Sequence, residues 1–448
     1  MSVSHLFKAE PVSQADRIRS LDCLRGVALL GILLMNIPVF ALPEHFTDAF
    51  HQNIHHQNFW VHAIITILFE GKMRALFSMI FGAGILLFIV RKEQAGLAFK
   101  SLFFKRMIWL VIFGLIHAHL MLWTGDILYF YGLIGILAFF FRHMQPRHLA
   151  MGVPIVAIAG FVLSTLFYQS IRQKRLDYIK VETRLKQGYA LKAVQRKTVT
   201  SWMDVQKEFI PDRQQIAAHT LLMKSGYKAV AGYIRPVTWD AQTKYFLFAL
   251  GDILALMLLG MALYHWGFFS GDWSARQYRQ TMVTGYGIGL PLVIYSYYQS
   301  YLRAPGSEAF IHYMENHPVI WTEIIYPFQR ILLVMAHASL LMLMIRSPLW
   351  ISFTKRLAAV GQMAFTNYIL QTLFCTFIFF GYGLNCFAEI EFYELYYIAG
   401  LIWVFQLIIS PIWLRYFLFG PLEWLWRSLT YWELQPMRRP PPVYVLLD

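Results

Sequence analysis

The sequence predicts an all-α polytopic membrane protein, a bundle of about ten transmembrane helices with both termini in the cytoplasm. Of the 448 residues, 58% are hydrophobic and 14% are charged, whereas roughly a quarter of the residues in soluble domains are charged. Uncharged runs approaching 20 residues recur along the chain. The excess of 39 Lys and Arg over 25 Asp and Glu fits basic cytoplasmic loops, so no nucleic-acid partner is expected.

Ten apolar segments are expected to cross the bilayer, and the charges of their connections set the orientation. The expected spans are 22–42, 59–90, 107–124, 127–141, 149–168, 244–267, 281–301, 322–345, 358–381 and 395–418. Basic connections such as 91–106 alternate with acidic ones such as 389–394. Because cytoplasmic loops are the basic ones, we expect a multi-pass protein of the bacterial inner membrane.

The spans divide the chain into five parts. A cytoplasmic segment (1–20) precedes a first membrane half of five spans (21–168), an external insertion (169–243), a second half of five spans (244–420) and a cytoplasmic tail (421–448). The insertion carries 14 Lys and Arg against 6 Asp and Glu. The charge rule fails for loops longer than about 60 residues, so the external assignment stands. Residues 172–209 are expected to form an amphipathic helical hairpin against the outer surface.

The first span begins with a charged turn that contains Arg19, Asp22 and Arg25, and it carries one polar amide, Asn36. Asn36 follows Arg25 by eleven positions, a rise of roughly 16 Å along a helix. If Arg25 lies at the membrane surface, Asn36 lies near mid-bilayer, where polar residues are functional candidates. A hydrogen bond to a neighbouring helix is the structural alternative.

The third span repeats this spacing, because His117 follows Arg106 by eleven positions. His117 and Asn36 should therefore share one depth, in a polar cavity open toward Arg25 and Arg106. A neutral histidine inside a bundle can act as a general base, although a core histidine with one hydrogen bond is equally consistent. Asp126 is a third catalytic candidate, and N-capping also explains it.

The second expected span contains the charged sequence Glu70-Gly71-Lys72-Met73-Arg74. Residues 59–90 would form a helix of roughly 48 Å, whereas the hydrocarbon core is about 30 Å thick. One interpretation is a helix broken at membrane depth, with Glu70, Lys72 and Arg74 lining a cavity. The other is an interfacial helix followed by a short span, with Glu70 and Arg74 as an ion pair.

Two later spans and an external histidine cluster supply the remaining candidates. A spacing of seven places Glu323, Arg330 and His337 on one stripe, which should face a shared internal cavity. In the next span, Asn367 and Gln371 share a face and are expected to line the same interior. The external cluster offers an alternative base, and its irregular spacing argues against zinc. The alternative bases are His55, His56 and His62.

Four groups of residues resemble a known family across nearly all spans. They are Leu21-Asp22 with Leu24-Arg25-Gly26 and Asn36; Leu76-Phe77 with Phe81-Gly82-Ala83-Gly84; Arg106, Gly114, His117 and Gly125-Asp126-Ile127-Leu128 with Tyr131-Gly132; and Gly361 with Met363-Ala364, Thr366-Asn367-Tyr368 and Gln371-Thr372. The combination resembles the YeiB-like family of uncharacterised bacterial inner membrane proteins. The first span is also similar to the multi-span acyltransferases that acylate envelope or lysosomal sugars.

The resemblance implies a bundle in which acyl groups from cytoplasmic acyl-CoA reach an acceptor on the far side. Many relatives carry histidine eleven residues after the arginine of the Leu-Arg-Gly motif, and here that position is Asn36. The heparan-glucosaminide type also has asparagine there, with its working histidine after the first span. Carried over to this chain, that histidine would be His55, His56 or His62.

Two functions remain open. The first is an acyltransferase that uses acyl-CoA and an envelope carbohydrate, with no tightly bound cofactor and no metal. Its donor would bind the cytoplasmic mouth, formed by Arg19, Asp22, Arg25 and Arg106. A histidine would act as base, and Asn36, Asn367 or Gln371 would stabilise the oxyanion. The second is a transporter or flippase that binds an anionic or lipid-linked solute at Lys72 and Arg330. Either way the partners are the lipid bilayer and a small-molecule or carbohydrate substrate, and the sequence sets no oligomeric state.

Overall fold

The computed structural model describes residues 19–43, 53–94, 99–210 and 212–439. Within these ranges the chain is helical, and one isolated β-bridge joins Phe417 and Arg438. The α-helices are α1 (Arg19–Ala41), α2 (Gln57–Leu68), α3 (Lys72–Gln94), α4 (Lys100–His119), α5 (Leu128–Phe139), α6 (Pro146–Ala150), α7 (Gly152–Lys186), α8 (Ala193–Phe209), α9 (Arg213–Met223), α10 (Tyr227–Thr243), α11 (Phe246–His265), α12 (Ala275–Tyr297), α13 (Ser307–Asn316), α14 (Thr322–Arg346), α15 (Ile351–Gln362), α16 (Ala364–Phe379), α17 (Leu395–Tyr416) and α18 (Pro421–Tyr431).

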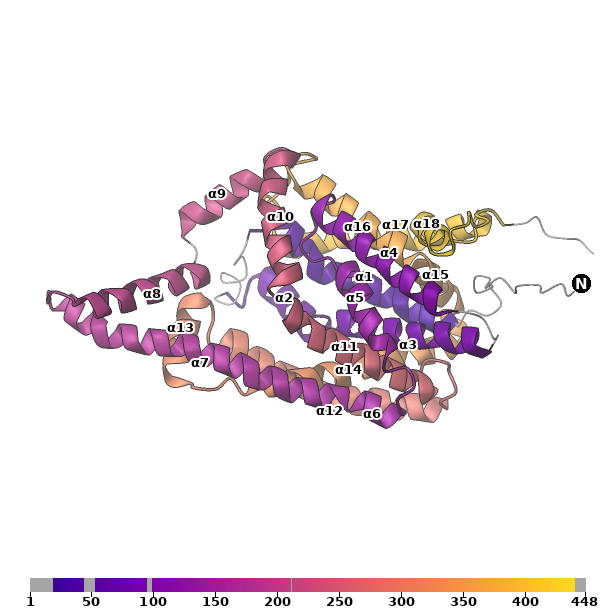
Figure 1. Cartoon of the computed structure of the whole chain (residues 1–448), viewed down its shortest axis with the longest axis horizontal. Coiled ribbons are helices and arrows are strands. Elements are labelled where there is room, and N and C mark those ends of the chain that lie inside the picture. The colour runs from indigo at the N-terminus through magenta and orange to yellow at the C-terminus, as the bar shows by residue number, and fades with distance from the viewer. Residues whose placement is uncertain (1–18, 44–52, 95–98, 211, 440–448) are drawn as a thin grey trace, which may run out of the picture.

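Every expected span coincides with a helix or a helix pair. Seven helical segments are long and apolar enough to cross a membrane, and the shorter helices α5 and α16 are also apolar. The helices form one bundle that follows the long axis of the molecule (Figure 1). The start of α1 and the whole of α18 lie at the same end, which we name the inner end after the charge prediction. The opposite end is the outer end.

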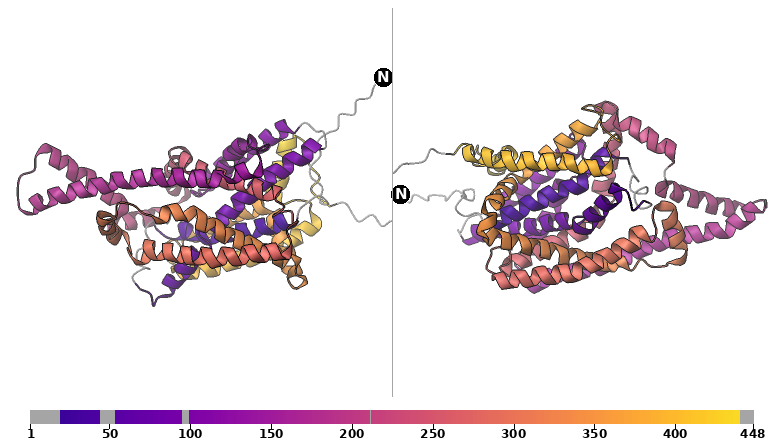
Figure 2. Two further views of the ribbon diagram at one scale, coloured as in Figure 1. Left: turned by 90° about the horizontal axis from the view of Figure 1, so that it is seen from below. Right: turned by 180° about the vertical axis from the view of Figure 1, so that it is seen from behind.

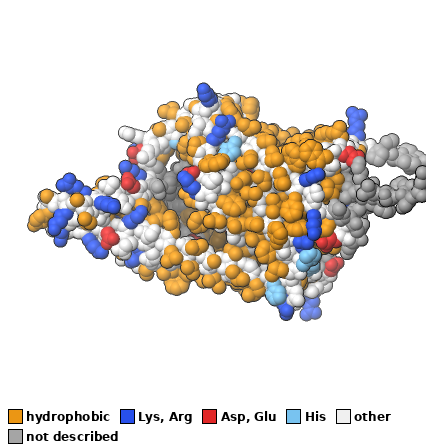
Figure 3. All heavy atoms as spheres, in the orientation of Figure 1, with side chains coloured by type: hydrophobic (Ala, Val, Ile, Leu, Met, Phe, Trp, Pro, Cys, Tyr) orange, Lys and Arg blue, Asp and Glu red, His pale blue; other side chains and the backbone are white. Residues whose placement is uncertain are grey.

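The surface of the bundle is suited to lipid. In Figure 3 hydrophobic side chains cover its middle, while Lys and Arg gather toward the two ends of the molecule. Large apolar side chains are exposed on several spans, for example Phe167, Phe248 and Leu401 at 66–70%. Such an extended apolar surface is rare on a soluble monomer. The all-α membrane bundle expected from the sequence is confirmed.

Two spans are interrupted. The break between α2 and α3 was expected, and it occurs at Gly71, whose φ is 69°. A Cβ at Gly71 would collide with the hydroxyl of Tyr326, so the turn requires glycine. The second break, at Met363 between α15 and α16, was not expected. At this break the carboxylate of Glu423 on α18 accepts hydrogen bonds from the amides of Phe365 and Thr366.

Glycine also brings α1 against α15. A Cβ on Gly26 would overlap the carbonyl of Leu357, and a Cβ on Gly361 would overlap the carbonyl of Asp22. The two backbones therefore touch, as in other membrane helix pairs that meet through small residues. This crossing fixes the position of Asp22 and Arg25 at the inner end.

The insertion differs from the expectation in where the fifth span ends and where the hairpin lies. The span expected at 149–168 does not end there, because α7 continues to Lys186. Residues 161–187 contain no Gly or Pro that would stop the helix before Gly188. The expected hairpin forms from α7 and α8, with Trp202 fully buried. It projects beyond the bundle instead of lying against it (Figures 1 and 2).

Candidate functional site

A cavity of about 260 Å³ lies between α1, α3, α4, α5, α16 and α18. Four arginines line its inner end, accompanied by the carboxylates of Asp22 and Glu423. They are Arg25, Arg91, Arg106 and Arg427. Its depth is lined mainly by aromatic and aliphatic side chains, including Phe77, Phe81, Tyr131 and Tyr368. The cavity thus joins a basic rim to an apolar interior.

The rim arginines are held in place by aromatic rings and backbone groups. The guanidinium of Arg106 stacks over Trp426 at 4.2 Å, and the indole N–H of Trp426 donates to the Arg106 carbonyl at 2.9 Å. Arg25 donates to Asp22 at 2.8 Å. Among the described residues, the buried Nη1 atom of Arg91 has no hydrogen-bond partner. A buried guanidinium donor without an acceptor is costly, so Arg91 is prepared to bind an anion.

Glu423 does not neutralise this rim freely, because its oxygens are engaged at the break in the α15–α16 span. Besides the two backbone amides, the hydroxyl of Thr366 donates to Oε2 at 2.6 Å. Burial raises the pKa of the Glu423 carboxyl. The Glu423 carboxyl is therefore occupied by the start of α16, and it adds less negative charge to the cavity than an exposed glutamate would.

Tyr368 closes the deep end of the cavity. Its hydroxyl accepts a hydrogen bond from Trp123 Nε1 at 3.1 Å and donates to the carbonyl of Gly125 at 3.2 Å. Its ring also packs against the ring of His117 in a T-shaped arrangement, with the ring centroids 5.0 Å apart. One aromatic ring therefore separates the cavity from a buried histidine.

His117 is hydrogen-bonded at both ring nitrogens and is completely buried. Its Nδ1 lies 2.7 Å from Oδ1 of Asp126, and its Nε2 lies 2.8 Å from Oγ1 of Thr372. The other oxygen of Asp126 accepts the amide of Tyr129, in the first turn of α5, at 2.8 Å. A carboxylate that holds one imidazole nitrogen fixes the tautomer and the orientation of the ring.

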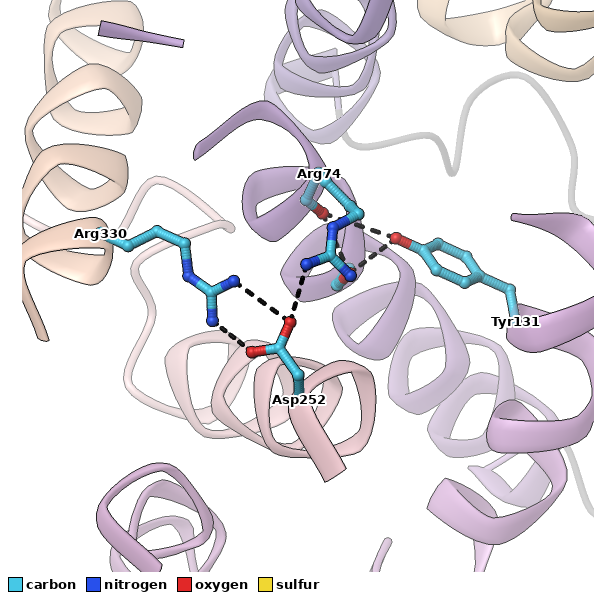
Figure 4. A network of polar contacts seen from close by, with 5 residues as sticks. Arg74, Tyr131, Asp252 and Arg330 are labelled. Atoms are coloured by element: carbon cyan, nitrogen blue, oxygen red, sulfur yellow. Dashed lines mark hydrogen bonds and ion pairs between the residues drawn. The ribbon is translucent and has the colours of Figure 1, made fainter. Parts of the chain in front are cut away.

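A second polar cluster lies beyond the deep end of the cavity (Figure 4). Asp252 on α11 accepts hydrogen bonds from Arg74 on α3, at 3.0 Å, and from Arg330 on α14, which engages both carboxylate oxygens. The hydroxyl of Tyr131, which lines the cavity, lies 2.6 Å from that of Ser78, one turn after Arg74 on α3. The cluster and the cavity therefore share a wall.

The carbonyls released where α2 ends are bonded by basic side chains. The ammonium of Lys72 donates to the carbonyl of Thr66 at 2.8 Å. His337 Nε2 donates to the carbonyl of Leu68 at 2.9 Å, so its Nδ1 accepts from Tyr286 Oη at 2.7 Å. These bonds replace the missing helical ones at the break.

The structure brings together only part of the predicted site. Asp22, Arg25 and Arg106 line the mouth as expected. Arg19 does not line it, since its guanidinium bonds the carbonyl of Ile351 and the hydroxyl of Thr354. His117 and Asp126 are bonded to each other. The cavity is lined by neither Asn36, which is half-buried, nor His117, contrary to the expectation of one shared cavity.

The residues expected to line this interior lie elsewhere. Lys72, Arg74, Arg330 and His337 surround the α2–α3 break, and Arg74 pairs with Asp252 instead of Glu70. Glu323 is exposed at the start of α14, and none of the three residues of the stripe lines the cavity at the arginine rim. Asn367 bonds Ser410 and the Val360 carbonyl, and Gln371 bonds Gln406. Both amides therefore contact α17. The spacing of Asn367 and Gln371 predicted that they share a helix face, but it could not predict which neighbouring helix that face contacts.

The three alternative histidines also lie apart from the cavity, and they differ in exposure. His55 and His56 are exposed, and Nδ1 of His56 caps α2 by accepting the amide of Asn58. His62 is buried, and its ring packs against Tyr297, Tyr301 and Phe392. Among the described residues, no group of three His, Cys, Asp or Glu side chains is placed to hold a metal ion.

Several residues of the site were not predicted as such. Arg91, Arg427 and Tyr368 line the cavity, and none of them was a candidate site residue in the sequence analysis. For Thr372 and Asp252, motifs in the sequence could have pointed to a role in the site. Thr372 belongs to the Thr366–Thr372 motif, and Asp252 lies in a second Gly-Asp-Ile-Leu that matches the one containing Asp126.

The comparisons with known proteins identify the family of this chain. The family described as "Protein of unknown function (DUF418)" matches residues 263–433. The uncharacterized protein YeiB of Escherichia coli (strain K12) is 30% identical over 430 residues, which cover 93% of this chain and 96% of YeiB. The uncharacterized protein YxaH of Bacillus subtilis (strain 168) is 28% identical over 446 residues, 96% of this chain and 98% of YxaH. No solved structure gives a significant match. This chain therefore belongs to the YeiB-like family of uncharacterised proteins.

Proposed function

We propose that this protein is a membrane acyltransferase that takes acyl groups from acyl-CoA at the inner end and passes them to an acceptor at the outer side. One observation carries the proposal: a cavity with a basic rim and an apolar depth ends on Tyr368, directly against the His117–Asp126 pair. A coenzyme A thioester has the matching form, since its phosphates are anionic and its pantetheine arm is thin and uncharged.

Each part of the cavity has a role in this mechanism. Arg25, Arg91 and Arg106 bind the phosphates, because guanidinium groups form bidentate hydrogen bonds with them. The acyl thioester lies in the aromatic depth. His117 lies two residues before the outer end of α4, so an acceptor from outside reaches it on the side opposite to the donor. There the imidazole removes the acceptor proton, which requires the Tyr368 ring to turn aside. The acceptor attacks the thioester carbonyl, the C–S bond breaks, and the imidazolium returns the proton to the departing coenzyme A thiolate.

The test is turnover of acyl-labelled acetyl-CoA by the purified full-length protein in lipid nanodiscs, with a bacterial envelope glycan fraction as acceptor. We expect Tyr368→Phe to retain turnover, since the ring still closes the cavity, and His117→Gln to lose it by roughly 100-fold or more. A wild-type protein that neither binds acetyl-CoA nor consumes it would refute the proposal.

A second candidate function is transport or flipping of an anionic or lipid-linked solute. The observation that favours it is the presence of two interrupted spans, at Gly71 and at Met363, because transporters bind ions and solutes where helices are broken. Proteoliposomes that move a labelled anionic lipid without consuming acetyl-CoA would support this candidate over acyl transfer.

A further inference from the structure

The cluster beyond the cavity carries more positive than negative charge. Arg74 and Arg330 share one carboxylate, Asp252, so these three side chains have a net charge of +1 (Figure 4). Lys72 and Glu70 act electrostatically on each other and balance. An excess cation among spanning helices is costly unless an anion joins it.

The excess charge is located at Arg74. Asp252 gives both of its oxygens to Arg330, whose side chain is 3% exposed, whereas the side chain of Arg74 is 40% exposed. Asp252 is the one acceptor that the described residues give to the Arg74 guanidinium. The buried Nε of Arg330 also has no hydrogen-bond partner among the described residues. Both arginines therefore retain donors for a further anion.

The position of the cluster along the membrane normal indicates from which side of the membrane an anion reaches it. Arg74 lies 17 residues before Arg91 on α3, and Arg330 lies 16 residues before Arg346 on α14. These offsets correspond to roughly 26 and 24 Å of helix, in a hydrocarbon core about 30 Å thick. Arg91 and Arg346 lie at the inner end, so the cluster lies near the outer boundary of the membrane.

The cluster is also close to the place where the donor would end. Ser78 contacts Tyr131 in the cavity wall and lies four residues after Arg74 on α3. Arg74 is therefore about one helical turn, roughly 6 Å, beyond that wall. A compound held at Arg74 by one end can present a hydroxyl or amine toward the donor.

We propose that Arg74 binds a phosphate or carboxylate group of the acyl acceptor, which is therefore an anionic compound that enters from the outer side. The acceptor identity rests on the proposed acyl transfer. The anion site itself is independent of turnover and can be tested by binding alone.

The experiment measures the Tm of three full-length proteins in nanodiscs: wild type, Arg74→Gln and the control Lys180→Gln. Lys180 is exposed on the hairpin and loses the same charge. Three conditions are compared: neutral phosphatidylcholine, phosphatidylcholine with inorganic phosphate, and phosphatidylcholine with phosphatidylglycerol. We expect an anion to raise the Tm of wild type and Lys180→Gln by roughly 2–4 °C and to leave Arg74→Gln unchanged. A rise with phosphatidylglycerol alone identifies a lipid-linked anion, and a rise with inorganic phosphate a soluble one.

Equal shifts in all three proteins, or no shift in any, would overturn the proposal. A second measurement separates binding from structure. Without added anion, Arg74→Gln should be at least as stable as wild type, because Asp252 and Arg330 remain as a neutral pair, whereas Asp252→Asn should be destabilised. If Arg74→Gln loses as much stability as Asp252→Asn, Arg74 is structural and the proposal fails. An anion shift in a protein without acetyl-CoA turnover would leave the site standing and refute acyl transfer alone.

Discussion

Nδ1 of His117 lies 2.7 Å from Oδ1 of Asp126, and both side chains are buried in the wall between the cavity and the outer end of the bundle. The same carboxylate accepts the amide of Tyr129 in the first turn of α5. Asp126 thus fixes a helix start and an imidazole orientation at once, so stability and activity have to be measured together for any variant of this pair.

Thr372→Val and His117→Ala should separate the two roles of this pair. Thr372→Val removes one hydrogen bond to a buried ring and should cost about 1 kcal/mol of stability. It should leave turnover of acetyl-CoA within a few-fold of wild type. His117→Ala leaves a cavity and an unpaired carboxylate, so it should cost about 3 kcal/mol or more and abolish turnover. A folded His117→Ala protein with wild-type turnover would exclude His117 as the base.

Arg91→Gln should weaken binding of the donor without unfolding the protein. The Nη1 atom of Arg91 is buried and has no partner among the described residues, so its removal costs no hydrogen bond that the free protein makes. The loss of one charge-assisted bond to a phosphate should weaken acetyl-CoA binding roughly 10- to 100-fold, as isothermal titration calorimetry would measure. Arg91→Lys, which keeps the charge, should recover part of the affinity. Unchanged affinity in Arg91→Gln would place the phosphates elsewhere.

Glu423 should make stability depend on pH. Burial raises the pKa of its carboxyl above the ordinary value of 4.5. Between 4.5 and the raised pKa, the folded chain keeps a proton that the unfolded chain has released, so stability falls as the pH rises through this window. Glu423→Gln has no proton to release. The Tm of wild type should therefore decline relative to that of Glu423→Gln as the pH rises from 4.5, and a constant difference would contradict this.

The limits of sequence reasoning are visible in particular residues. Hydrophobic runs were sufficient to locate every span, and Gly71 marked the first helix break. The second break was not located in this way, because Gly361 beside it packs against α1 and the amides freed there are bonded by Glu423, which is 60 residues away from Met363 in the sequence. The partner of Arg74 could not be predicted either. Glu70 is near in sequence, but packing of α3 against α11 places Asp252 beside it. Equal offsets predict a common depth for Asn36 and His117, yet they could not predict the direction in which the two side chains face.

Gly361→Ala should damage the inner end of the cavity. A Cβ at this position overlaps the carbonyl of Asp22, so α1 has to move away from α15, at a cost of about 1–3 kcal/mol or more. Asp22 and Arg25 move with α1, and acetyl-CoA binding should weaken together with the Tm. Gly160→Ala is the matched control, since a Cβ there meets nothing within 4 Å. It should keep or raise the Tm, and equal losses in both variants would refute the close crossing.

The orientation of the bundle decides which side supplies the donor, and single cysteines can report it. The basic loops at the end that carries the arginine rim predict that this end faces the cytoplasm, where acyl-CoA is made. Ala190 is exposed in the connection between α7 and α8, and Ser352 is exposed at the start of α15 at the inner end. Cys23 and Cys375 are buried, but Cys386 is partly exposed, so the cysteines are introduced into a Cys386→Ser protein.

Intact cells are then treated with a membrane-impermeant maleimide. Ala190→Cys should be labelled at once, and Ser352→Cys only after the membrane is permeabilised. The hairpin is a demanding test of the orientation, because it is rich in Lys and Arg although it is predicted to be external, and only its length exempts it from the charge rule. Labelling of Ser352→Cys in intact cells, with Ala190→Cys protected, would invert the bundle. The arginine rim would then face away from acyl-CoA, and the proposed direction of acyl transfer would fail with it.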